Sequence, residues 1–270
     1  MTSTAKLNSA SRHHRFSATV RRLARRAAEL VSLGTALIVL SGTAPLRAAE
    51  AWPEMPAPPK AKVQWIAQNM RVNGIPTRVW QFQSRASRQE VIAYYTAYWS
   101  GDGAGGYDHK PSVHALGDAT VIGQVHGPYL MNVKIEDGPK SSSKGLISVA
   151  QVLGSKPDHD PGQVPLMPGG HVVSVVESSD PGKQSRQVLI LTPQPLASVI
   201  QFYRASFLNG GWKQVQGDAQ PRRIGRVSTS FAVFAREDAE MQLSMVDSAQ
   251  GRGSTLLANL VTKDTGPGAR

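Results

Sequence analysis

The chain repeats the order of its apolar blocks at an offset of about 108 residues, and this repeat limits the possible folds more than any other feature. Residues 91–95 in the first half lie over 199–203 in the second, and the Gly-aromatic pair 106–107 matches 211–212 after a small gap. Few matches are identities, but the order of the blocks is the same. Two copies indicate a duplicated domain, because solenoid arrays need about three or more repeats to bury a continuous core.

Each copy begins with two predicted strands and a helix. In the first copy, strands 63–72 and 75–82 meet at Asn73-Gly74, a strong hairpin signal, and Ser87 with Glu90 spells a capping box for the helix that follows. In the second copy the strands are 171–177 and 186–191. Its helix is predicted to begin with Thr192 as N-cap and Pro193 in the first helical position.

Three more strands close each copy, so the predicted order is ββαβββ. They are 119–126, 129–135 and 145–152 in the first copy, and 229–235, 240–246 and 254–261 in the second. A lone helix against an antiparallel sheet is a two-layer α+β arrangement. The sequence therefore predicts an α+β fold, a tandem duplication of this small module.

The order of domains follows from this repeat and from two proline-rich stretches. The predicted segments are a leader (1–51), a linker (52–62), the first module (63–153), a second linker (154–170), the second module (171–263) and a disordered tail (264–270).

The leader carries more than half of the net positive charge. Residues 1–51 hold eight of the 30 Lys and Arg residues and two of the 19 acidic residues, which leaves 22 basic and 17 acidic residues, a net charge of +5, for the rest. The overall charge of +11 is therefore mainly a targeting feature. We expect no nucleic-acid partner.

The leader has the order of a secretory signal peptide. A basic stretch ends at Arg26, an apolar run follows over 30–40, and the small residues Ala48, Ala49 and Ala51 suit a cleavage site. We expect an exported protein in the periplasm of a Gram-negative cell. The alternative is an uncleaved inner-membrane anchor over 27–43, with the body in the periplasm; this would be the chain's one link to a membrane.

The body contains no arrangement that predicts catalysis, a metal site or a cofactor. The chain has no cysteine, so thiol chemistry is excluded. The glycines of 101–106 match G-x-G-x-x-G, but a predicted helix precedes them and a strand follows, the reverse of a dinucleotide-binding loop. Asp158-His159-Asp160 lies in a linker that would not fix metal ligands. We expect no enzymatic activity.

Basic loop residues and two tryptophans are the candidates for partner contact. Lys144 and Arg252 lie at the tips of equivalent predicted hairpins. The densest basic cluster of the body is Arg222, Arg223 and Arg226, and Trp52 and Trp65 fall outside the aromatic pattern that the two copies share.

We therefore expect a non-catalytic envelope protein whose duplicated modules bind another envelope protein, as an accessory component of a secretion, pilus or envelope-biogenesis assembly. The alternative is a module that binds a small ligand or anionic glycan between the two copies. Strands 145–152 and 254–261 carry no charge, so each is either central or an unprotected docking edge. The sequence leaves both possibilities open, as it does the oligomeric state.

Overall fold

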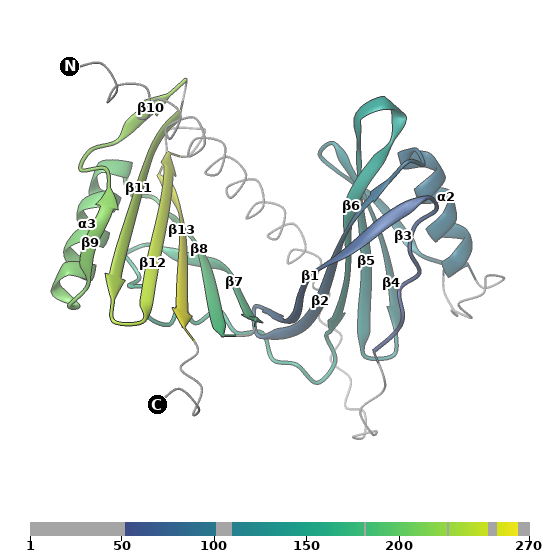
Figure 1. Cartoon of the computed structure of the whole chain (residues 1–270), viewed down its shortest axis with the longest axis horizontal. Helices are drawn as coiled ribbons and strands as arrows, with labels where there is room; N and C mark the ends of the chain where they lie inside the picture. Colours follow the sequence, from purple (N-terminus) through teal and green to yellow (C-terminus); the bar gives the residue numbers. More distant parts are fainter. Residues whose placement is uncertain (1–51, 101–109, 181, 226, 248–252, 264–270) are drawn as a thin grey trace, which may run out of the picture. The chain divides into compact units, whose positions relative to one another are not determined.

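The computed structural model describes residues 52–100, 110–180, 182–225, 227–247 and 253–263 (Figure 1). The chain divides into two compact units. The first unit holds the described residues up to Asp158, and the second holds most of those from His159 to Lys263. The leader and the tail lie outside the described residues. Among the described residues, no helix is long and apolar enough to cross a membrane.

The first unit is an antiparallel sheet with one α-helix, α2, among its described residues. Its elements are β1 (Ala61–Val72), β2 (Ile75–Ser84), α2 (Arg88–Trp99), β3 (Ser112–Leu116), β4 (Ala119–His126), β5 (Tyr129–Asp137), the 3-10 turn η1 (Pro139–Ser141) and β6 (Ser143–Gln151). The strands lie in the order β1-β2-β6-β5-β4-β3.

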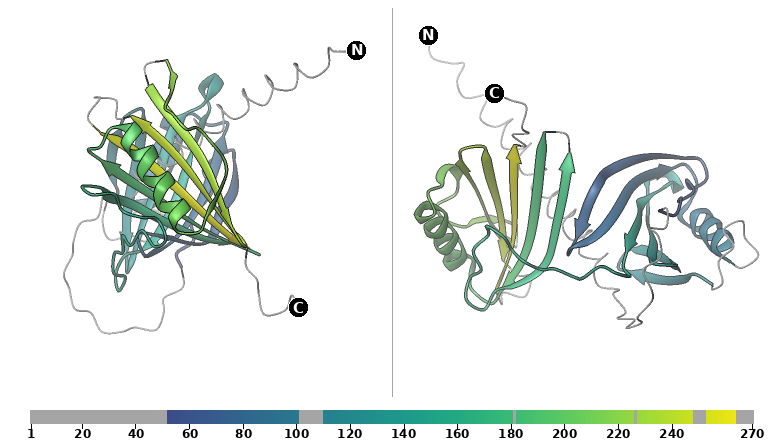
Figure 2. Two further views of the ribbon diagram at one scale, coloured as in Figure 1. Left: turned by 90° about the vertical axis from the view of Figure 1, so that its left-hand side faces the viewer. Right: turned by 90° about the horizontal axis from the view of Figure 1, so that it is seen from below.

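The second unit is built in the same way. Its elements are β7 (His171–Asp180), β8 (Lys183–Thr192), α3 (Leu196–Asn209), β9 (Lys213–Gly217), β10 (Arg222–Ile224), β11 (Val227–Arg236), β12 (Ala239–Asp247) and β13 (Ser254–Lys263). The strands lie in the order β7-β8-β13-β12-β11-β10, and β9 also pairs with β11. In each unit the helix lies against the sheet (Figure 2).

The predicted fold class, an α+β tandem of ββαβββ modules, is wrong. The described residues form 13 strands and two α-helices, which is a fold dominated by antiparallel sheet. The strands missing from the prediction are β3, β9 and β10. All of β3 and β10 is exposed, and β9 is nearly so. Without a buried face, these short strands carry no clear apolar alternation, so the sequence pattern passes over them.

The predictions made from turn and helix-cap residues were partly correct. Asn73 and Gly74 both have positive φ, 49° and 75°, as the predicted two-residue hairpin requires. The capping box at Ser87 and Glu90 is confirmed. The second helix start is wrong, because α3 begins at Leu196 after Pro195 and has no side-chain cap.

The core of each unit lies between its helix and its sheet. Helix α2 buries Val91, Tyr95 and Trp99 against the strands, and α3 buries Tyr203 and Phe207 together with three aliphatic residues. The phenol of Tyr95 also donates a hydrogen bond to the Pro56 carbonyl oxygen at 2.7 Å. Burial, with smaller contributions from Tyr94 and Tyr98, raises the pKa of Tyr95 far above its ordinary value, so this phenol stays protonated.

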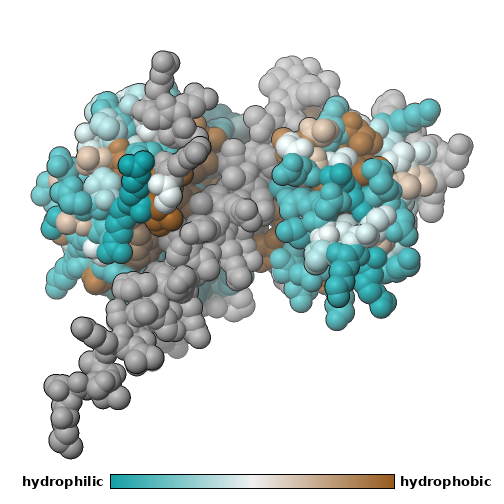
Figure 3. Space-filling view, turned by 90° about the horizontal axis from the view of Figure 1, so that it is seen from above, coloured by the Kyte–Doolittle hydropathy of each residue, from teal (hydrophilic) through white to brown (hydrophobic). Residues whose placement is uncertain are grey.

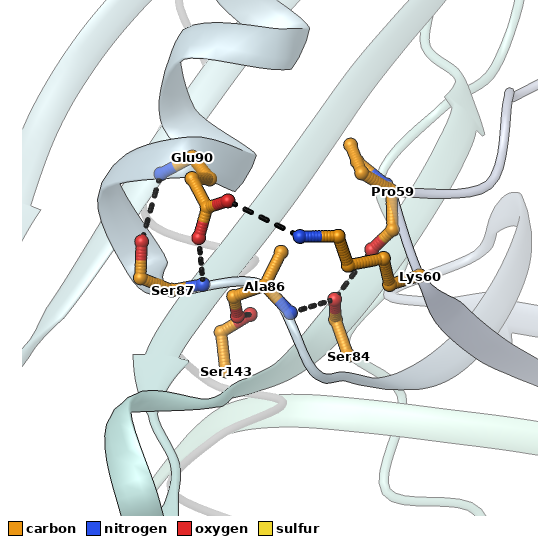
Figure 4. Close-up of polar contacts among 7 residues, drawn as sticks. All are labelled: Pro59, Lys60, Ser84, Ala86, Ser87, Glu90 and Ser143. Carbon is orange, nitrogen blue, oxygen red and sulfur yellow. Dashed lines mark hydrogen bonds and ion pairs between the residues drawn. The ribbon is translucent and has the colours of Figure 1, made fainter.

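Figure 4 shows the polar contacts where β2 leads into α2. The Ser87 hydroxyl accepts a hydrogen bond from the Glu90 backbone at 3.2 Å, and a Glu90 carboxylate oxygen accepts one from the Ser87 backbone at 2.7 Å. Lys60 lies 3.5 Å from the same carboxylate. Hydrogen bonds with Ser87 and the charge of Lys60 hold the pKa of Glu90 below its ordinary value.

A buried hydroxyl corner follows the second strand of each unit. In the first unit the Ala86 N–H donates to the Ser84 hydroxyl, and the Ser143 hydroxyl donates to the Ala86 carbonyl, both at 2.9 Å (Figure 4). In the second unit Gln194 takes the place of Ala86. Its backbone N–H donates to Thr192 Oγ1 at 3.2 Å, and its carbonyl oxygen accepts a hydrogen bond from the Ser254 hydroxyl at 2.9 Å. The two units therefore share this pair of hydrogen bonds.

Ser143→Ala and Ser254→Ala are expected to destabilise their own units by similar amounts. Each change leaves the carbonyl of the corner without its donor, in a buried place at Ala86 and a half-buried one at Gln194, which typically costs about 1–3 kcal/mol. Urea unfolding of the two variants measures the effect. A lower free energy of unfolding in one variant and an unchanged value in the other would contradict the shared role of the corner.

The two uncharged strands are central, so they are not docking edges. Strand β6 pairs with β2 on one side and β5 on the other. Strand β13 likewise lies between β8 and β12. A strand with a partner on each side needs no charge or proline to prevent pairing, which explains the absence of charge over 145–152 and 254–261.

Candidate interaction surface

A row of apolar side chains crosses the first unit's sheet on the face that carries α2. Cross-strand pairing joins its members one to the next, from β1 through β2, β6, β5 and β4 to β3. They are Trp65, Trp80, Ile147, Val133, Ile122 and Val113. Because paired residues share a face, this row forms one continuous strip.

Only the middle of this row is buried. Ile147, Val133 and Ile122 in the middle are at most 1% exposed. The two ends of the row reach the surface, where Trp65 and Val113 are each 46% exposed. The apolar strip of the core therefore continues into two exposed ends.

The end on β1 carries the larger side chains. The rings of Trp65 and Trp80 lie 4.4 Å apart between centroids at 39°, and Trp80 packs against the core. Val63, two residues before Trp65, is 36% exposed and pairs with the buried Phe82. We call Val63, Trp65 and Trp80 the tryptophan patch. In this patch the core supports Trp80, and Trp80 in turn contacts Trp65.

The second unit carries a smaller row at the equivalent place. Val188 stands where the first unit has Trp80, and its row continues through Ala258 and Leu243 to Ala232. All four are buried, none more than 6% exposed. The tryptophan patch is therefore a feature of the first unit.

Of the two tryptophans proposed from the sequence, Trp65 lies at the surface and Trp52 packs on the core. The Trp52 ring lies 5.1 Å from that of Tyr129, and the Arg78 guanidinium covers it at 4.5 Å. After Trp52 the chain exposes Glu54 and Ala57, three residues apart, which is the period of a polyproline II helix, and this period ends at Lys60, which lies in a turn with positive φ. Proline spacing at 53, 56 and 59 was the signal for this period.

The basic candidates do not gather at one place. Lys144 lies 3.5 Å from Glu136, which also pairs with Lys134 at 2.9 Å. Burial raises the pKa of Glu136, but the hydrogen bonds and charges of the two lysines outweigh it, so the net pKa is below the ordinary value. Lys144 is thus engaged by this carboxylate, although its side chain is 57% exposed.

Arg222 and Arg223 lie on β10, at the edge of the second unit. Arg222 pairs with Asp218 at 2.6 Å, and Arg223 donates to the Gly225 carbonyl at 3.3 Å. Arg226 and Arg252 fall outside the described residues. Within the residues that the structure describes, no three His, Asp or Glu side chains come together to hold a metal ion.

Sequence reasoning found Trp65 but missed Val63 and Trp80 as its neighbours. The signal was present, because 63 and 65 alternate on one strand and Trp80 is opposite once the Asn73-Gly74 turn fixes the register. Seen from above, the coloured surface is mostly hydrophilic, with smaller hydrophobic areas (Figure 3).

Comparison with known proteins gives limited matches. Residues 172–253 match a family model described as START domain-like, which covers most of the second unit and less than half of the chain. No curated protein matches the chain. Among solved structures, the acyl-CoA thioesterase II TesB2 from Mycobacterium marinum is similar at 12% identity, over 71% of this chain and 94% of that chain, with a TM-score of 0.14.

Proposed function

We propose that the protein is an exported, non-catalytic envelope protein whose first unit binds another envelope protein through the tryptophan patch. The observation that carries this proposal is the 46% exposure of Trp65 on top of Trp80, next to the exposed Val63. Tryptophan is enriched among the residues that dominate binding energy in protein interfaces. Export follows from the leader sequence.

The geometry of the patch supports a protein partner. An indole ring that is already packed against another ring, as Trp65 is against Trp80, loses less conformational freedom on binding, so more of the apolar area it buries contributes to affinity. The patch is also continuous with the core through Trp80, and its exposed side chains suit a partner that supplies an apolar pocket.

Trp65→Ala is expected to reduce recovery of the partner at least tenfold, since truncating an interface hot spot typically costs about 2 kcal/mol or more. The measurement is recovery of a stoichiometric protein from cross-linked envelope extract. Leu166→Ala is the matched control, because Leu166 is an exposed apolar residue of the second unit, at 47% exposure. Undiminished recovery by Trp65→Ala, with its fold intact, would reject the patch as the contact.

A second candidate function is binding of a small ligand or anionic glycan, and the START domain-like match favours placing it in the second unit. A ligand between α3 and the sheet would have to displace packed side chains, since Phe207 lies 5.1 Å from Phe234 and 5.7 Å from Trp212 between ring centroids. A thermal shift with small ligands or polysaccharides, without any protein partner, would favour this candidate.

A further inference from the structure

The β10–β11 hairpin of the second unit extends beyond the strands next to it (Figures 1 and 2). Arg222, Arg223 and Ile224 pair with Thr229, Ser228 and Val227. Strand β12 pairs with β11 only from Thr229 onward, and β9 only from Ala232 onward. Residues 222–225 and 227–228 therefore form a projecting tip, and among the described residues no third strand pairs with it.

The tip exposes aliphatic side chains. Ile224 is 43% exposed and Val227 is 36% exposed. They are direct cross-strand partners, so they stand side by side on one face of the hairpin. The core of the second unit does not include either residue.

One arginine lies beside this aliphatic pair, and a second lies on the opposite face of the hairpin. Arg222 shares the face of Ile224, being two residues away, and its side chain is 66% exposed even with Asp218 as its partner. Within the described part of the chain, Arg223 uses only Nε, in its bond to Gly225, so the end of its guanidinium remains available. Two arginines and one aspartate leave the tip positively charged.

Protection of a sheet edge explains part of this arrangement. Arginines on a short edge strand prevent pairing with other chains. Edge protection does not require exposed Ile224 and Val227 at the far end of the hairpin. Aliphatic side chains beside guanidinium groups are the combination that binds an anionic bilayer, because the first enter the headgroup–acyl boundary and the second bind phosphates.

We propose that the β10–β11 tip binds the surface of a membrane that contains anionic phospholipid. Ile224 and Val227 enter the interfacial region, and Arg222 and Arg223 contact lipid phosphates. This contact is separate from the tryptophan patch and does not depend on it. It orients the second unit towards the membrane.

The absence of cysteine from the chain permits a direct test. The full chain is prepared as Ile224→Cys and, as a control, as Val113→Cys, an exposed position of the first unit. Each is labelled with a polarity-sensitive fluorophore and mixed with vesicles of phosphatidylcholine alone, or of phosphatidylcholine and phosphatidylglycerol in equal amounts. The control reports any binding that the leader causes, since the leader is present in both.

A blue-shifted, brighter signal at 224 with anionic vesicles only, and no such change at 113, is the expected result. Adding Arg222→Gln and Arg223→Gln to the 224 label should weaken apparent vesicle affinity about 25-fold, since each arginine near an anionic surface contributes about fivefold. Circular dichroism checks that these exposed changes leave the fold intact. No signal at 224, an equal signal at both positions, or an affinity unaffected by loss of the arginines would overturn the proposal.

Discussion

Ser148→Pro is expected to unfold the first unit. Ser148 is 2% exposed in the middle of β6, between Val79 on β2 and Asn132 on β5. Proline removes a backbone donor and clashes within a central strand, and this position offers no edge or bulge to relieve the clash. Hydrogen exchange of the full chain should show loss of protection across β2, β5 and β6.

Ser148→Ala is the control for this substitution, since it removes the hydroxyl and keeps the backbone donor. It should leave protection of the first unit nearly unchanged. Ala258→Pro, in β13 between β8 and β12, should have the corresponding effect on the second unit. Normal protection of β2 and β5 in Ser148→Pro would contradict the central position of β6.

Tyr203→Ala is expected to lower the free energy of unfolding of the second unit by about 3–5 kcal/mol, the usual cost of truncating a buried aromatic side chain. Tyr203 is 1% exposed on the inner side of α3, and its ring packs against Phe202 and Phe207 at centroid distances of 5.0 and 6.4 Å. Burial raises its pKa to about 12 despite an opposing backbone contact from Met167, so the ring is neutral. Urea unfolding gives the value.

Tyr203→Phe keeps the ring and isolates the hydroxyl, so it should cost far less than the alanine variant. An alanine variant with unchanged stability would show that Tyr203 does not serve as a core residue.

Sequence patterns predicted the buried parts of this fold better than the exposed parts. The apolar stripe of α2 and the Asn73-Gly74 turn have strong local causes, namely helical spacing and a backbone of positive φ. Strand β10 has only three residues, all exposed, and is defined by its pairing with β11. Such pairing is a tertiary interaction that no local pattern reports.

The candidate surfaces, too, were predictable from the sequence only where a local signal marks them. Trp65 was identifiable because it falls outside the aromatic pattern common to both copies. Trp52 carries the same sequence signal, but it packs on the core. Its partners Arg78 and Tyr129 lie far from it in sequence, so no local pattern reports that they cover it. The tip at Ile224 and Val227 was hidden, because a short apolar pair beside arginines resembles an ordinary edge strand until its exposure and projection are known.

Site-specific photo-cross-linking in cells tests the role of the tryptophan patch most directly. A photoreactive phenylalanine analogue replaces Trp65 in one strain and Val215, a 61% exposed apolar residue of β9, in another. We predict one discrete cross-linked species of higher mass from position 65 and none of that mass from position 215. The absence of a cross-link at position 65, or the same species from both positions, would contradict the assignment of the patch as the partner contact.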